Sequence, residues 1–263
     1  MTRTSFAPQW ESLFPHDLER AACQQAEDLS CTTDGTYRLH SGKWVLVDIG
    51  SESVDFVNGH NMCIGSGLGP ICSSDWNSVV KTGETLFGLG INPAVVSIDH
   101  SAVIASAIRS VCVDAVVITC WPHLIRKCAQ QARRLPSQSA FEDFMKNHIY
   151  NLHHARTQEL FMAMAQVFVN HWEQHGAAEY AAWFKKIYLE DQWSRWYVSS
   201  SGMAGVLTSQ QAIESHHASI KLIAAENLRA PPATVLNMVI PRLLKHDDTR
   251  LTDSPIRHYC EDH

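Results

Sequence analysis

The sequence predicts an α/β fold in which a mixed sheet of five strands is flanked by helices. Three β-prone runs, TYRL, WVLV and NMCIGSG, follow one another between turn signals and predict a three-stranded meander. Two continuous apolar runs, AVVSI ending at Ile98 and AVVITC ending at Cys120, flank a segment with helical spacing. Because such runs are typical of strands buried on both faces, they predict parallel strands joined by a helical crossover.

Helical patterns complete the expected order of elements. Residues 73–90 predict a helix that begins after Ser73 or Ser74, so the order is βββαβαβ. Phe161, Phe168 and Trp172 lie on one face of a further helix, typical of a packed core. We therefore expect a helical lead-in at 1–30, a first core part at 31–136, a helical insertion at 137–200, a last core part at 201–246 and a tail at 247–263.

Composition narrows the class of protein. The 263 residues, 45% of them hydrophobic, suffice for one sizeable core. No signal-peptide pattern and no apolar run of membrane-spanning length is present, and the 8 cysteines are scattered, so we expect no membrane partner and reduced thiols in the cytosol or nucleus. A net charge of -6 argues against binding nucleic acid by bulk charge.

Three acidic residues are candidate metal ligands. Asp34 on the first strand and Asp99 after the fourth would meet if those strands are neighbours, and Glu214 on the last helix would supply a third carboxylate. Two Mg²⁺ ions held by such carboxylates at about 3.5 to 4 Å can clamp the attacking and leaving oxygens of a phosphodiester.

Each candidate ligand has a plainer interpretation. Asp48, at the end of WVLV, is an alternative to Asp34 as the strand-end acid. Asp99 alone is typical of a helix N-cap, and Glu214 alone is typical of a solvated helix residue. Cys120 and His123 form a Cys-x-x-His pair that fits active-site architecture, ordinary packing or a metal site, although no second ligand pair for a structural zinc follows.

Four segments taken together resemble a known family. CTTDGTYRL, VVSIDHSAVIASAI, AVVITCWPHLIRK and LTSQQAIESHHASIK are similar, in this order, to the signatures of Mutator-like element transposases. The resemblance implies an RNase H-like fold of the DDE superfamily, with Asp34, Asp99 and Glu214 as ligands of two Mg²⁺ or Mn²⁺ ions. It also implies cleavage and transfer of DNA strands in the nucleus, by a homo-oligomer that binds element ends and target DNA.

Two departures from the family pattern support an alternative function. His100 stands where the family has Gly, and His217 stands where Asn commonly follows the last acid, so both would adjust contacts around the ligands. A domesticated or inactive transposase-derived protein that binds DNA and regulates transcription is therefore the alternative. In either case Arg126, Lys127 and Lys221 are candidate contacts to DNA phosphate.

Overall fold

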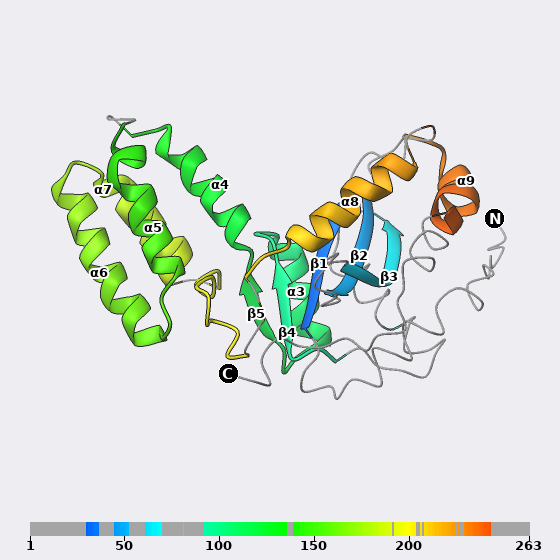
Figure 1. Cartoon of the computed structure of the whole chain (residues 1–263), viewed down its shortest axis with the longest axis horizontal. Coiled ribbons are helices and arrows are strands. Elements are labelled where there is room, and N and C mark those ends of the chain that lie inside the picture. Colours follow the sequence, from blue (N-terminus) through cyan, green and yellow to red (C-terminus); the bar gives the residue numbers. More distant parts are fainter. Residues whose placement is uncertain are drawn as a thin grey trace, which may run out of the picture.

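A computed structural model of the chain describes part of it. The described residues are 30–36, 45–52, 61–69, 81, 92–135, 139–190, 192–203, 206, 208–224, 226 and 229–242. The expected lead-in before Ser30, the helix at 73–90 apart from Lys81, and the tail at 247–263 lie outside these ranges. Figure 1 shows a sheet with its covering helices and, to one side, a group of helices that α4 connects to the sheet.

The sheet contains five strands in the order β3-β2-β1-β4-β5. On one side of the central strand β1 (Ser30–Thr36) the pairing is antiparallel, first with β2 (Val45–Glu52) and then from β2 to β3 (Asn61–Gly69). On the other side, β1 pairs in parallel with β4 (Val95–Ile98), which pairs in parallel with β5 (Val116–Thr119). All four residues of β4 are buried, as expected for its apolar run.

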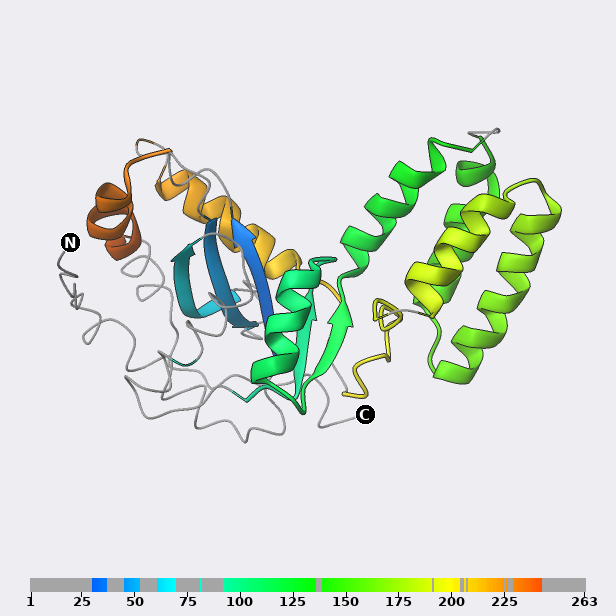
Figure 2. The same ribbon diagram turned by 180° about the vertical axis from the view of Figure 1, so that it is seen from behind.

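Helices cover both faces of this sheet. The crossover helix α3 (Ala102–Val111) begins at Ser101, whose side chain accepts a hydrogen bond from the backbone N–H of Ile104 at 3.4 Å. Its apolar face, which includes Ala105 and Ile108, is buried. Helix α8 (Gln211–Ile223) crosses the opposite face of the sheet, as the two views together show (Figures 1 and 2).

The remaining helices form a second packed region. Helix α4 (Trp121–Ala132) leads away from the end of β5 to α5 (Lys146–His153), α6 (Gln158–Gln174) and α7 (Ala178–Phe184). Phe161 and Trp172 of α6 are buried together with Phe184 and Trp196, so the predicted aromatic stripe packs as core. The other elements are α9 (Pro232–Thr234) and the π-helical segments η2 (Phe141–Met145), η3 (Lys185–Leu189) and η5 (Val235–Val239).

The expected fold class needs a correction. We expected an RNase H-like mixed five-stranded sheet flanked by helices, with an all-helical insertion before the last helix. Instead, helices account for far more of the described residues than strands, and parallel pairing is confined to the three strands β1, β4 and β5. The physical reason is the large number of aromatic residues at 139–197, most of them on helices, which extend the core well beyond the buried residues of β1 and β4 in the same cluster. Within the described ranges no helix combines the length and hydropathy needed to cross a membrane.

Candidate metal centre

Asp34 lies on the strand that pairs with β4. The parallel register of β1 and β4 ends at Thr33 and Ile98, so Asp34 and Asp99 are the next residues of the two strands. Asp48 is the Cα partner of Asp34 on β2, and β1 separates it from β4. Asp34 is therefore the acid on the strand beside β4, and Asp48 is one strand further away.

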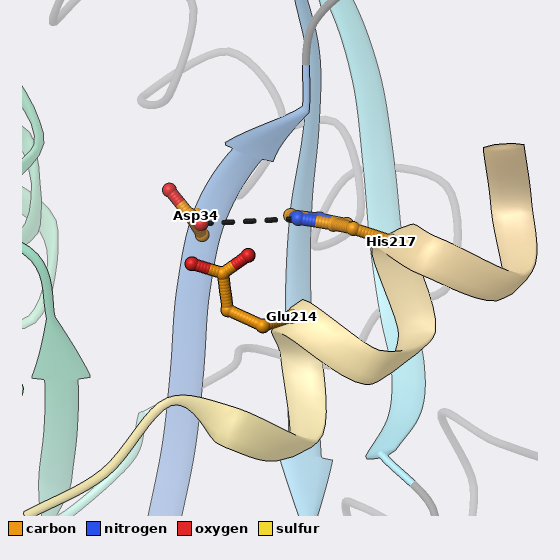
Figure 3. Close-up of side chains that lie close together, drawn as sticks. All are labelled: Asp34, Glu214 and His217. Atoms are coloured by element: carbon orange, nitrogen blue, oxygen red, sulfur yellow. Dashed lines mark ion pairs between the residues drawn. The ribbon is translucent and has the colours of Figure 1, made fainter. Parts of the chain in front are cut away.

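Asp34 meets two side chains of α8. One ligand atom from each of Asp34, Glu214 and His217 can be chosen so that all three lie within 4.8 Å of one another. His217 Nδ1 is 3.8 Å from Asp34 Oδ2. Figure 3 shows Glu214 and His217 projecting from successive turns of α8 toward Asp34 on β1. Residues far apart in the sequence thus form one cluster that could hold a metal ion, the only such group of three among the described residues.

Burial differs across the cluster. The side chain of His217 is 3% exposed, that of Asp34 is 15% exposed and that of Glu214 is 43% exposed. The imidazole is therefore fixed beneath α8, whereas the Glu214 carboxylate opens to solvent. Such a gradient lets a metal ion contact protein ligands on one side and water or substrate on the other.

Gln210 fastens the beginning of α8 to the sheet. Its fully buried side-chain amide donates from Nε2 to the carbonyl oxygens of Thr33, at 2.7 Å, and of Ser97, at 3.0 Å. These carbonyls belong to the adjacent parallel strands β1 and β4. Because Gln210 is four residues before Glu214, this contact fixes the position and direction of α8 over the sheet. Helix α8 carries both Glu214 and His217. Sequence reasoning missed Gln210, since one polar residue before a helix gives no periodic signal.

Asp99 does not belong to the cluster. Its Oδ1 accepts a hydrogen bond from the backbone N–H of Ser101 at 2.8 Å, at the start of α3. The structure therefore brings two of the three predicted acids together, whereas Asp99 makes a local contact with the backbone of Ser101, the residue that caps α3. His217, predicted to adjust contacts around the ligands, is itself within ligand distance.

Cys120 and His123 reach the cluster through Glu214. Cys120 Sγ is 3.1 Å from His123 Nδ1, and His123 Nε2 is 3.2 Å from Glu214 Oε1. Burial raises the pKa of the Cys120 thiol to about 11, so the thiol stays protonated and can donate to Nδ1. Burial also lowers the pKa of His123, which favours a neutral ring that donates from Nε2 to the carboxylate. This relay orients Glu214 as an outer hydrogen bond orients a metal ligand.

The Cys-x-x-His pair is accordingly explained without zinc. Among the described residues, Cys120 and His123 are not part of any group of three side chains close enough to hold one ion. Cys120 follows β5 as the N-cap residue of α4 and His123 lies in the first turn of that helix, so the three-residue spacing alone brings the two side chains together.

A cavity of about 760 Å³ opens beside Glu214. Its lining comes from the beginning of α4, the end of α5, Val198, and the segment that leads into α8. It contains aromatic, polar and charged side chains: Cys120, Trp121, Pro122, His123, Ile125, Arg126, Tyr150, His153, Val198, Thr208, Ser209, Gln210, Gln211 and Glu214. The cluster therefore lies at the edge of a space large enough for part of a polymeric substrate.

The basic candidates have different surroundings. Arg126 lines the cavity, and its guanidinium lies 3.8 Å from Glu214 Oε1. Lys127 on α4 and Lys221 on α8 are exposed but do not line the cavity. Arg126 is therefore the predicted DNA contact that lies both at the cavity and beside Glu214.

His100 packs away from the ligand set. Its ring lies 5.3 Å from that of Tyr188 and 5.4 Å from that of Trp193, between centroids. Burial, followed by the nearby His123 and Lys127, lowers its pKa to about 4, so the ring is neutral near pH 7. His100, at the position where Mutator-like element transposases have glycine, thus packs against aromatic residues of the helical region.

The donor set suits a divalent ion that accepts nitrogen. Mg²⁺ is held in proteins mainly by oxygen ligands and water. Two carboxylates with one imidazole instead favour Mn²⁺ and its neighbours in the first transition row, which accept both donor types. The residues present fit a divalent metal, and the imidazole of His217 would favour an ion that accepts nitrogen.

Comparison with known proteins does not assign the chain to a family. No model of a known protein family matches the sequence, and no curated protein matches it. The resemblance to Mutator-like element transposases therefore stays a prediction from the four quoted segments.

Proposed function

We propose that this protein is a metal-dependent enzyme that cleaves and transfers DNA strands, as the core of a DDE-type transposase does. One observation carries the proposal: Asp34 and Glu214 converge, together with His217, at the edge of a cavity that also contains Arg126. We further propose that its partners are DNA and other copies of the chain, and that it works in the nucleus.

Each residue has a defined part in this chemistry. Asp34, Glu214 and His217 would hold the ion or ions, and a bound ion would supply Lewis acidity for attack by water, and later by a 3′-hydroxyl, on phosphorus. The new bond joins the attacking oxygen to phosphorus while the bond to the leaving 3′-oxygen breaks. His123 keeps Glu214 oriented through the 3.2 Å contact, and Arg126 contacts a phosphate oxygen of the strand.

The decisive experiment is a nicking assay with the full chain fused to a DNA-binding domain. The fusion supplies the substrate affinity that a net charge of -6 disfavours. We expect Mn²⁺-dependent nicking, with a weaker Mg²⁺ response, and a loss of two or more orders of magnitude in Glu214→Gln, which removes one anionic ligand. Glu173→Gln, at an exposed position of α6, is the matched control and should be unaffected. A folded, DNA-bound fusion that is inactive with both ions contradicts the proposal.

One contact favours the alternative, a DNA-binding regulator without catalysis. Asp99 contacts the backbone of Ser101 instead of the cluster, which leaves two carboxylates where the predicted triad has three. A comparison of Asp99→Asn with His217→Ala tests which set acts. If the observed cluster is the metal centre, Asp99→Asn keeps most of the activity, because asparagine can accept the same Ser101 hydrogen bond, and His217→Ala loses it. Inactivity of the wild type together with tight DNA binding supports the regulator.

A further inference from the structure

The cavity beside the metal cluster has two chemically different walls. Residues 208–211 and the side chains of Arg126 and Glu214 make one wall polar and charged. The other wall is aromatic and contains Trp121, Tyr150 and His153. A ligand that fits both walls has a flat ring joined to an anionic group.

Within the aromatic wall, the ring of Trp121 already packs against other aromatic rings. It stacks on His153 with centroids 4.2 Å apart and planes 5° from parallel, and it lies nearly parallel to buried Trp196 at 5.8 Å. Tyr150 meets Trp121 edge to face at 5.0 Å and remains 40% exposed. The Trp121 contacts hold the wall rigid, and Tyr150 offers the ring surface that a flat ligand can cover.

Arg126 is held where it can reach an anion at the same cavity. Its Nε donates to the carbonyl oxygen of Pro122 at 3.1 Å, which fixes the guanidinium relative to α4. Another nitrogen of that group lies 3.8 Å from Glu214 Oε1, so the free side of the guanidinium borders both the cavity and the cluster. A phosphate bound there would lie next to the carboxylate proposed to hold metal.

We propose that this cavity takes one unpaired nucleobase of the DNA strand, stacked on Tyr150, with the adjoining phosphate on Arg126. The inference deepens the proposed function, on which it rests, because it names a single-stranded nucleotide beside the cleaved bond as the recognised part of the substrate. Base stacking on an aromatic side chain is tolerant of sequence, since every base has a π-face. A base inside a duplex has both faces covered by neighbouring base pairs, so neither face is free to stack on Tyr150.

The test is a binding measurement that does not require cleavage. The full chain is titrated, in EDTA, against a short single-stranded oligonucleotide that carries 2-aminopurine, whose fluorescence falls on stacking, and against the same strand paired in a duplex. We expect quenching with the single strand and none with the duplex. Tyr150→Ala should weaken single-strand binding about tenfold, as loss of one base–aromatic stack does, and Tyr150→Phe should restore it. Leu160→Ala, at a 46% exposed position on α6 outside the cavity, is the control and should bind normally.

The outcomes separate this inference from the proposed enzyme. Equal binding and quenching by wild type and Tyr150→Ala, with circular dichroism showing both folded, overturns the stacked base. Equal weakening by Tyr150→Phe and Tyr150→Ala also overturns it, because the hydroxyl would then be the contact. Absence of single-strand binding by the wild type overturns it as well, whereas quenching without metal-dependent nicking supports the base site and contradicts only the enzyme.

Discussion

Replacement of Gln210 by alanine should loosen α8 from the sheet. The substitution removes two hydrogen bonds, to Thr33 O at 2.7 Å and Ser97 O at 3.0 Å, at a site with no solvent exposure. Each intramolecular hydrogen bond contributes about 1 kcal/mol, and a buried carbonyl left without a donor costs about 1 to 3 kcal/mol. Since water can re-satisfy part of this, we expect the free energy of unfolding to fall by about 2 to 4 kcal/mol.

The assay is equilibrium urea unfolding of wild type, Gln210→Ala and Gln211→Ala. Gln211 is the adjacent glutamine and is exposed, so its truncation should change stability by less than about 0.5 kcal/mol. Mn²⁺ affinity, measured by calorimetry on folded protein, should also fall in Gln210→Ala, because α8 carries Glu214 and His217. Equal midpoints for the two alanine variants would refute the role of Gln210 as the contact that holds α8 on β1 and β4.

Three further predictions concern the centre and its surroundings. His217→Asp should shift ion preference from Mn²⁺ toward Mg²⁺, because it replaces the nitrogen donor by oxygen. Calorimetry with both ions measures this preference, and an unchanged Mn²⁺ preference would exclude His217 as a ligand. His123→Ala should reduce Mn²⁺ affinity about 10- to 100-fold, because Glu214 loses the hydrogen bond that orients it. Cys120→Ser keeps a donor to Nδ1 of His123 and should reduce the affinity less. Equal Mn²⁺ affinities of the wild type and both variants would dismiss the role of the Cys120–His123–Glu214 contacts. His100 has a pKa of about 4 when folded and 6.5 when exposed, so the unfolded chain binds this proton first and stability is lost as pH falls from 6.5 toward 4. His100→Phe should remove that loss, about 2 kcal/mol at pH 5, and parallel urea midpoints for both proteins at pH 7 and pH 5 would disprove it.

The sequence by itself determined the local elements around the site. The run VVSI is apolar enough to be buried on both faces, and it forms β4; Ser101 follows with the side chain that caps α3. The aromatic residues of α6 predicted core, and Phe161 and Trp172 are buried. Asp34 and Glu214 could be chosen as candidates because carboxylates are the chemistry that a divalent ion needs.

Only the tertiary structure decided which of the candidates meet. The sequence left Asp99 two possible roles, as a metal ligand or in a contact at the start of a helix, and the structure shows it accepting the N–H of Ser101. His217 becomes a candidate ligand only because Gln210 places α8 across β1, an encounter between residues distant in sequence that no local pattern reports. Long-range contacts of this kind depend on the packing of whole elements, whereas caps, stripes and apolar runs depend on neighbours a few residues away. The three-residue spacing of Cys120 and His123 accounts for their contact with each other, whereas the docking of α8 determined that His123 also contacts Glu214.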